Sequence, residues 1–164
     1  MDLHREFENI ISKKKPTFPI SKHFIFYLAR YQRYFQFNIA YDDLLRWDTS
    51  FAVIDESGKD TLWRTVVYSP DERDEINDSL LRIYVYLTAE LEHAVMEHLI
   101  VDSVDYCLFG NSNPFRIKIR NLLNDNHDYY YIKRPDASRV YGLELEEMLS
   151  PNKVFYLVNE STLV

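Results

Sequence analysis

Glycine is scarce in this chain, and its scarcity excludes two common nucleotide-binding motifs. The 164 residues include only three glycines, Gly58, Gly110 and Gly142, and no two of them lie within ten residues of each other. P-loops and dinucleotide-binding turns need closely spaced glycines, because backbone N–H groups must approach the phosphates. The sequence therefore contains neither motif.

Cysteine is nearly absent as well. Cys107 is the only one, which excludes an internal disulfide and a zinc site built from several cysteines. A chain without such crosslinks is typical of a reducing compartment, so we expect a cytoplasmic protein. Cys107 lies between Tyr106 and Leu108, and in that setting we expect a small buried hydrophobic residue.

Long uninterrupted apolar runs are missing too. Residues 1–19 are charged and lack the apolar centre of a signal peptide. The most apolar window, 79–101, is interrupted by Arg82, Glu90, Glu92 and Glu97. Charged side chains at these positions would be costly in the middle of a bilayer. The sequence therefore predicts a soluble protein that does not enter a membrane.

Acidic residues outnumber basic ones, which bears on the choice of partners. The net charge is −7 and the predicted pI is about 5.2, and an acidic chain is repelled by phosphate backbones, which disfavours nucleic acid as a partner. Hydrophobic residues make up 46% of the chain, with 13 tyrosines and 10 phenylalanines. That composition is sufficient for a folded core in one domain, or in two very small ones.

Helical periodicity predominates in the first two thirds of the sequence. Apolar residues recur at helical spacing in residues 2–12, where Leu3, Phe7, Ile10 and Ile11 form a stripe. Two further segments show the same periodicity: the aromatic segment 22–37, and a long segment that begins at Pro70 and runs through Leu99.

Between these helices the pattern changes to strands. A hairpin around Gly58 is predicted near residues 50–68, and residues 99–107 fit either an extension of the long helix or a strand. We therefore predict an α+β fold, in which a mainly helical amino-terminal region with a β-hairpin spans residues 1–108.

Residues 109–164 predict a small mixed region of strands and helix. Strands are expected at 115–123 and 129–135, followed by a helix over 138–149. The strand-like residues 154–164 end the sequence without a charged tail, so we expect this region to be the start of a larger domain that continues beyond Val164.

The clearest functional pattern is a lysine at a strand end, followed by acidic residues on a helix. Lys133 ends the run of tyrosines at 129–131, and Glu144 and Glu147 share one face of the next helix. A flexible cation needs an anionic partner if it is to be held ready for a phosphate group. Here residues 109–164 resemble the amino-terminal lobe of a divergent, atypical protein-kinase-like fold.

This resemblance implies that Lys133 contacts the phosphates of ATP with Mg²⁺, and that Glu144 or Glu147 holds the lysine in position. Arg116 and Lys118 would add positive potential. The chain contains no HRD or DFG triplet and only Gly110 in the loop before the strands. We therefore expect a lobe of a larger protein that binds a nucleotide or phosphate and is not an enzyme on its own.

Two other functions fit the sequence. The first is a protein-interaction module that uses the aromatic helix 22–37 and the basic strand 116–120, with a protein partner or a second copy of the chain. In that case Lys133 is a solvated charge at a strand end, and the basic residues can also pair with acidic ones of the same chain. The second is a helical metal-binding protein, suggested by Glu90 and His93 one helical turn apart.

Overall fold

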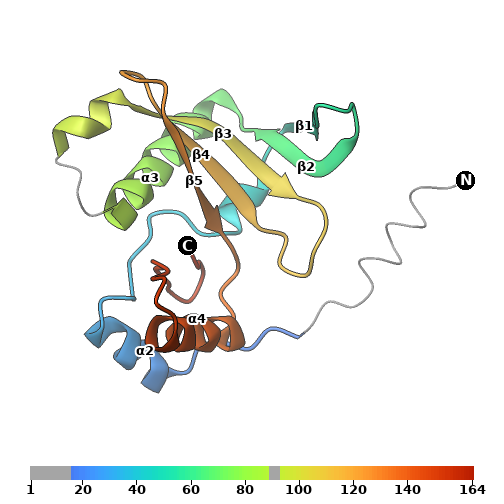
Figure 1. Ribbon diagram of the computed structural model, residues 1–164. Helices are drawn as coiled ribbons and strands as arrows, with labels where there is room; N and C mark the ends of the chain where they lie inside the picture. The colour runs from blue at the N-terminus through green and yellow to red at the C-terminus, as the bar shows by residue number, and fades with distance from the viewer. Residues whose placement is uncertain (1–15, 89–92) are drawn as a thin grey trace, which may run out of the picture.

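Five strands form one antiparallel sheet, in which each strand pairs with the next one along the chain (Figure 1). The computed structural model describes residues 16–88 and 93–164. The strands are β1 (Thr49–Ile54), β2 (Asp60–Val67), β3 (Leu99–Cys107), β4 (Phe115–Asn121) and β5 (His127–Ile132). The α-helices are α2 (Lys22–Arg30), α3 (Pro70–Thr88) and α4 (Ala137–Leu149), and short 3₁₀ helices span Asp43–Leu45 and His93–His98.

The prediction of a mainly helical amino-terminal region is wrong. Three of the five strands, β1, β2 and β3, lie before residue 109, and β3 pairs with β4 across that point. The predicted helix 22–37 ends at Arg30, and the predicted helix 2–12 lies outside the described residues.

The predicted long helix is also too long. Helix α3 ends at Thr88, whose hydroxyl donates to the carbonyl oxygen of Tyr84 at 3.0 Å. Leu99 is the first residue of strand β3. Its place in the helical spacing of the preceding segment is therefore a coincidence. The sequence does not identify this strand clearly, because Asp102 and Asp105 interrupt the alternation of apolar and polar residues that is typical of strands.

The hairpin predicted near residues 50–68 is confirmed. Strands β1 and β2 pair around a turn in which Gly58 has a φ of +81°, a conformation that glycine adopts without strain. The Asp55 carboxylate accepts hydrogen bonds from the backbone N–H groups of Ser57 and Lys59, each at 2.9 Å. These contacts fix the turn.

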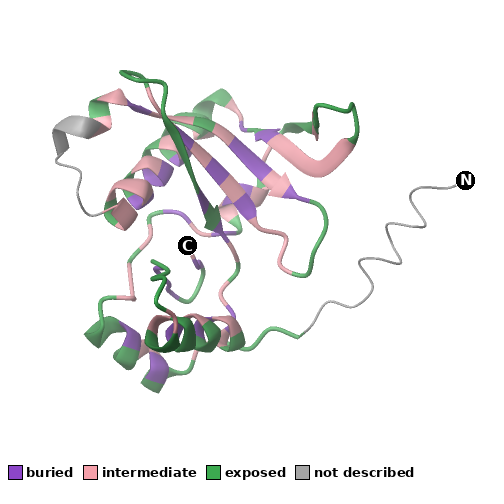
Figure 2. Cartoon of the chain, viewed as in Figure 1, coloured by how far each residue is buried: buried purple, intermediate pink, exposed green. Residues whose placement is uncertain are grey.

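One face of the sheet packs against α3 and forms the larger core. Ile117 and Ile119 of β4 are buried together with Leu80 and Ile83 of α3. Figure 2 shows buried positions along the strands of the sheet and on α3. Tyr130 of β5 is also buried, and its hydroxyl donates to the carbonyl oxygen of Leu80 at 2.7 Å. We refer to residues 39–132 as the sheet region.

Helices α2 and α4 lie together on the other side of the molecule from α3 and form a second, smaller core with the carboxyl-terminal segment 154–164. Its buried hydrophobic residues are Phe24, Leu28, Val140, Tyr156, Val158 and Leu163. Ser21 caps α2 by accepting a hydrogen bond from the N–H group of Phe24 at 3.3 Å. The segment predicted as a strand forms only isolated bridges, at Val158 and Leu163. We refer to α2, α4 and residues 154–164 as the helix-pair region.

Within the two described stretches, no helix is both long enough and apolar enough to cross a membrane.

Candidate anion-binding site

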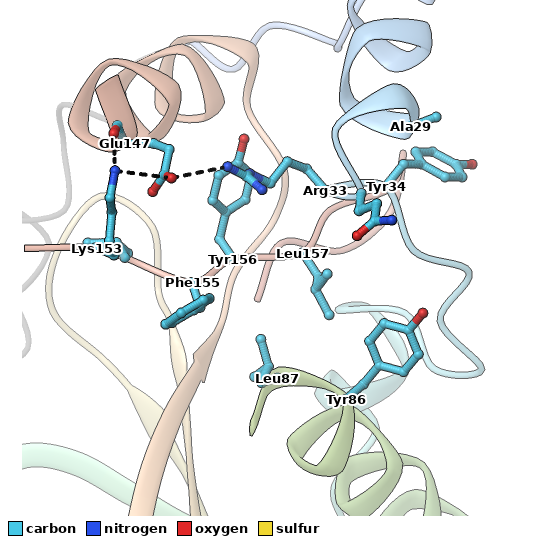
Figure 3. Close-up of a pocket in the computed structure, with 12 residues that line it drawn as sticks. Ala29, Arg33, Tyr34, Tyr86, Leu87, Glu147, Lys153, Phe155, Tyr156 and Leu157 are labelled. Carbon is cyan, nitrogen blue, oxygen red and sulfur yellow. Dashed lines mark hydrogen bonds and ion pairs between the residues drawn. The ribbon is translucent and has the colours of Figure 1, made fainter. Parts of the chain in front are cut away.

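The sheet region and the helix-pair region contact each other near the carboxyl terminus, where the Tyr41 N–H group donates to the Thr162 hydroxyl at 3.1 Å and Val164 packs against the larger core. Two hollows lie beside residues 153–157, a segment that contributes to the lining of both. The first hollow has a volume of about 540 Å³ and lies between α2, the end of α3 and the segment (Figure 3). The second has a volume of about 330 Å³ and lies between β5, α4 and the same segment. Both are lined by Leu87 and Phe155.

The charges that line the first hollow neutralise one another. Glu147 Oε1 lies 3.5 Å from the Arg33 guanidinium and 3.3 Å from Lys153 Nζ, and both cations point toward it (Figure 3). Lys153 Nζ also donates to the carbonyl oxygen of Glu147 at 2.8 Å. An additional anion would therefore have to compete with a carboxylate that is already in place.

Glu144 is buried behind this hollow and has three partners. Its carboxylate lies 3.3 Å from Arg33 Nε, accepts a hydrogen bond from the Tyr27 hydroxyl at 2.9 Å and accepts another from the Tyr156 hydroxyl. Burial, and then the bond to Glu144, raise the pKa of Tyr156, and the bond to Glu144 raises the pKa of Tyr27. The carboxylate thus holds α2, α4 and the carboxyl-terminal segment together.

The structure therefore places both glutamates beside Arg33 and not beside Lys133. No acidic group among the described residues lies within 4.0 Å of Lys133 Nζ. The buried residues of α4 are Val140 and Glu144, so the face that carries Glu144 points inward. The sequence pattern gave no sign of Arg33, which precedes Glu144 by more than a hundred residues.

Lys133 instead shares the second hollow with another cation. Lys133 and Arg139 both line it, both are half-buried, and within residues 16–88 and 93–164 neither forms an ion pair. Burial lowers the pKa of Lys133, and the neighbouring Arg139 lowers it further. Among the described residues, the Arg139 side chain donates only one hydrogen bond. Its acceptor is the carbonyl oxygen of Arg134, at the long distance of 3.4 Å.

Aromatic side chains surround these two cations. Tyr129, Tyr131 and Phe155 line the second hollow and are 42%, 46% and 79% exposed. The first two belong to β5, which is an edge strand of the sheet. The Arg116 guanidinium lies over the Tyr129 ring, 5.5 Å from its centroid, so Tyr131 and Phe155 are the aromatic side chains left to a ligand. The hollow therefore combines positive charge with partly exposed aromatic side chains, an arrangement suited to an anion attached to a planar group.

The predicted basic residues of β4 lie elsewhere and are neutralised. Arg116 donates to Asp105 at 2.8 Å and 3.1 Å, and its guanidinium stacks 4.5 Å from the Trp63 ring centroid. Lys118 lies 2.9 Å from Asp102, and this hydrogen bond holds the pKa of Asp102 below its usual value. The expected pairing with acidic residues of the same chain is confirmed for both, and neither lines the second hollow.

Sequence reasoning missed Phe155 and Arg33 as residues that line a hollow. Phe155 lies beside Tyr156 in a segment for which a strand was expected. Alternation places the two side chains on opposite faces but does not determine which of them is exposed. Arg139 had a usable signal, because it lies in the first turn of the helix that follows Lys133. A short polar break between a strand and a helix brings such residues close together.

No metal site is found in the part of the chain that the structure describes. There, no three His, Cys, Asp or Glu side chains lie close enough together to hold an ion. Glu90, one half of the suggested metal-binding pair, lies outside the described residues. Comparisons with models of known protein families, with curated proteins and with solved structures found no match.

Proposed function

We propose that this chain binds a small phosphate-bearing ligand in the second hollow, with a nucleotide such as ATP as the first candidate. One observation carries the proposal: Lys133 and Arg139 line the same hollow, and neither has an ion-pair partner among the described residues. Two neighbouring like charges that are partly removed from water raise each other's energy. A bound phosphate relieves that repulsion and forms charge-assisted hydrogen bonds with both groups.

The two cations suit different parts of a phosphate chain. The Lys133 ammonium is a compact charge on a flexible stem, whereas the planar Arg139 guanidinium can donate two parallel hydrogen bonds to one phosphate. Phe155 and Tyr131 offer ring faces on which a nucleobase can stack. The proposal assigns binding and no catalysis, because the chain lacks the residues that would act as base or metal ligand in a kinase.

The kinase-like resemblance supports this proposal only through Lys133. The helical glutamate that would anchor a kinase lysine is occupied by Arg33 and two tyrosines. In this chain Arg139 takes part in its place, so the lysine is held beside a second cation and not beside a carboxylate.

Calorimetric titration of the full chain with ATP, ADP and inorganic phosphate tests the proposal. We expect Lys133→Met and Arg139→Met each to weaken ATP binding by about tenfold or more, the loss of one charge-assisted contact. Lys59→Met is the matched control, because Lys59 is an exposed lysine in the β1–β2 turn. Equal ATP affinity in all four proteins, or no binding by the unaltered chain, would overturn the proposal.

A second candidate function, a protein-interaction module, is favoured by one feature of α2. Phe26 projects from this helix with 74% of its surface exposed, and exposed aromatic side chains are enriched in interfaces. The basic strand contributes less than the sequence suggested, since Arg116 and Lys118 already have partners. Light scattering of the full chain and its Phe26→Ala variant tests this: a dimer lost in the variant supports it, and a monomer in both counts against self-association.

A further inference from the structure

Helix α4 carries an exposed apolar ridge. Tyr141, Leu145 and Leu149 follow one another at intervals of four residues and are 52%, 55% and 79% exposed. Met148, which is 72% exposed, lies one turn after Leu145 and widens the ridge. Side chains four residues apart form a continuous row on the surface of a helix. The inward side of α4 carries Glu144 and its buried neighbours, so the ridge points away from the smaller core.

A wide groove runs beside this ridge, because the adjacent row of α4 begins with two small residues. Ser138 and Gly142 lie four residues apart, and both are exposed. A Cβ atom added at Gly142 would meet no atom of the described residues within 4 Å beyond its chain neighbours and the helix backbone. Glycine destabilises a helix interior relative to alanine. The groove therefore has room for a side chain from another helix.

Aromatic rings extend the apolar surface from α4 onto α2. The Phe24 ring lies 4.2 Å from the Tyr141 ring and 5.8 Å from the Tyr27 ring, measured between centroids. The Tyr27 and Tyr31 rings are 4.6 Å apart, and these two residues are 38% and 50% exposed. The ridge on α4 is thus one part of a larger apolar surface on the two helices.

This surface is large enough for a small specific interface. A fully exposed side chain of this size offers roughly 150 Å² or more. Six side chains contribute, and their exposed fractions add to about 500 Å² of surface in each copy of the chain: Tyr27, Tyr31, Tyr141, Leu145, Met148 and Leu149. Two such surfaces bury about 1,000 Å² together, which is the lower limit for a specific protein interface.

The shape and charge of α4 favour a second copy of the same chain as the partner. The ridge and the groove lie on one helix, so a two-fold axis seats each ridge in the groove of the other copy at the same time. The residues of the ridge and the groove are all uncharged. Because each copy has a net charge of −7, an uncharged face is where two copies meet with the least repulsion.

We propose that two copies of this chain associate through α4 about a two-fold axis. The two α4 helices cross, and Leu145 of each copy lies over Gly142 of the other. The neighbouring Tyr27 and Tyr31 complete the buried surface. This inference depends neither on the phosphate site nor on Phe26, the residue that the interaction-module function uses.

Sedimentation equilibrium of the full chain, over concentrations around the micromolar values expected for a small interface, tests the proposal. We expect a monomer–dimer equilibrium whose dissociation constant rises about tenfold or more in Leu145→Glu, because the variant places a charge in the buried centre. The matched control is Leu123→Glu, at a position in the turn after β4 that is 70% exposed, and it should dissociate like the unaltered chain.

Three results would overturn the proposal. A monomer at every concentration would leave the surface to a different partner. Equal weakening by Leu145→Glu and Leu123→Glu would assign the effect to the added negative charge alone. A dimer that is lost in Phe26→Ala and kept in Leu145→Glu would move the interface to the other side of α2.

Substitution of Gly142 separates the interface from the fold. Gly142→Gln should raise the Tm of the monomer, measured below the dissociation constant, because glutamine favours helix and has open space there. The same variant fills the groove, so the dissociation constant should rise about tenfold or more. Gly142→Ala adds only a methyl group and should raise the Tm with a smaller change in association. An unchanged dissociation constant in Gly142→Gln would contradict the proposal.

Discussion

The sheet region and the helix-pair region bury their residues in different ways. The sheet region has a large apolar core, in which Ile117, Ile119 and Leu80 are almost completely inaccessible to solvent. The smaller core of the helix-pair region includes a buried carboxylate. Glu144 accepts hydrogen bonds from Tyr27 and Tyr156 and pairs with Arg33. A core too small to exclude polar groups can still be ordered if each polar group has its partners.

The space between the two regions is neither an apolar core nor a core built around a carboxylate, and it contains the candidate site. Binding sites often lie where two packed units meet, since neither unit fills the space between them completely. Here the sheet region contributes Tyr129 and Tyr131 of β5, Lys133 directly follows this strand, and the helix-pair region contributes Arg139 and Phe155. The comparison predicts that stability depends on the two cores, whereas binding depends on the space between them.

The largest effect is expected in the apolar core. Ile117→Ala should lower the free energy of unfolding by about 3 kcal/mol, because the substitution leaves a cavity between β4 and α3. Urea unfolding followed by circular dichroism measures this loss. The control is Ile54→Ala on β1, where the side chain is 52% exposed and the expected loss is small. Similar losses in the two variants would show that the sheet core is not packed as described.

The next largest effect is expected at the buried carboxylate. Glu144→Ala should lower the free energy of unfolding by about 2 kcal/mol, because it leaves the Tyr27 and Tyr156 hydroxyls without their acceptor. Hydrogen exchange should become faster in α2 and α4 while β4 stays protected. Glu146→Ala, at an exposed position on the same helix, should change little. Faster exchange throughout the sheet would mean that the two regions unfold as one unit.

The pH dependence of binding distinguishes the site from the two cores. Burial and Arg139 lower the pKa of Lys133 from its usual value of 10.5, so the ammonium loses its proton at a lower pH than an exposed lysine. ATP affinity should therefore fall by about tenfold as the pH rises through that lowered pKa, because one charge-assisted bond is lost. Lys133→Arg should bind ATP without this decline, since arginine stays charged. The same decline in Lys133→Arg would assign it to another group.

The smallest effect concerns the cost of Lys133 to stability. Since folding lowers the pKa of this lysine, the folded state holds the proton less tightly than the unfolded state. The penalty is therefore fully present below the lowered pKa, and it is relieved as the pH rises from that value to the usual 10.5. At neutral pH, Lys133→Met should raise the stability by up to about 1 kcal/mol while it weakens ATP binding. A lower Tm for this variant would show that the ammonium has a stabilising partner.

Local patterns predicted the elements whose signals are complete within the sequence segment. The hairpin around Gly58, the alternation in β4 and the helix predicted over 138–149 agree with the structure, in which that helix is Ala137–Leu149. Strand β3 could not be predicted in the same way, because the partners of Asp102 and Asp105 lie on neighbouring strands, with Lys118 and Arg116 of β4 among them. These pairs become visible only when the register between the strands is known.

The candidate site was predictable in part, for the same reason. Lys133 at a strand end and Arg139 in the next helix are close in sequence, so their proximity follows from a short connection. The choice of Arg33 as the partner of Glu144 depends on how α2 packs against α4. Spacing within one helix cannot predict contacts between helices that are far apart in the chain.

The most direct test of the account is an NMR titration of the ¹⁵N-labelled full chain with ATP and, separately, with inorganic phosphate. The account predicts that the largest chemical-shift changes cluster at Tyr131, Lys133, Arg139 and Phe155, and that Lys133→Met moves their midpoint to an ATP concentration about tenfold higher or more. Shift changes that cluster at Arg33 and Lys153, or the absence of any change at millimolar ligand, would contradict the claim that the space between the two regions binds phosphate at Lys133.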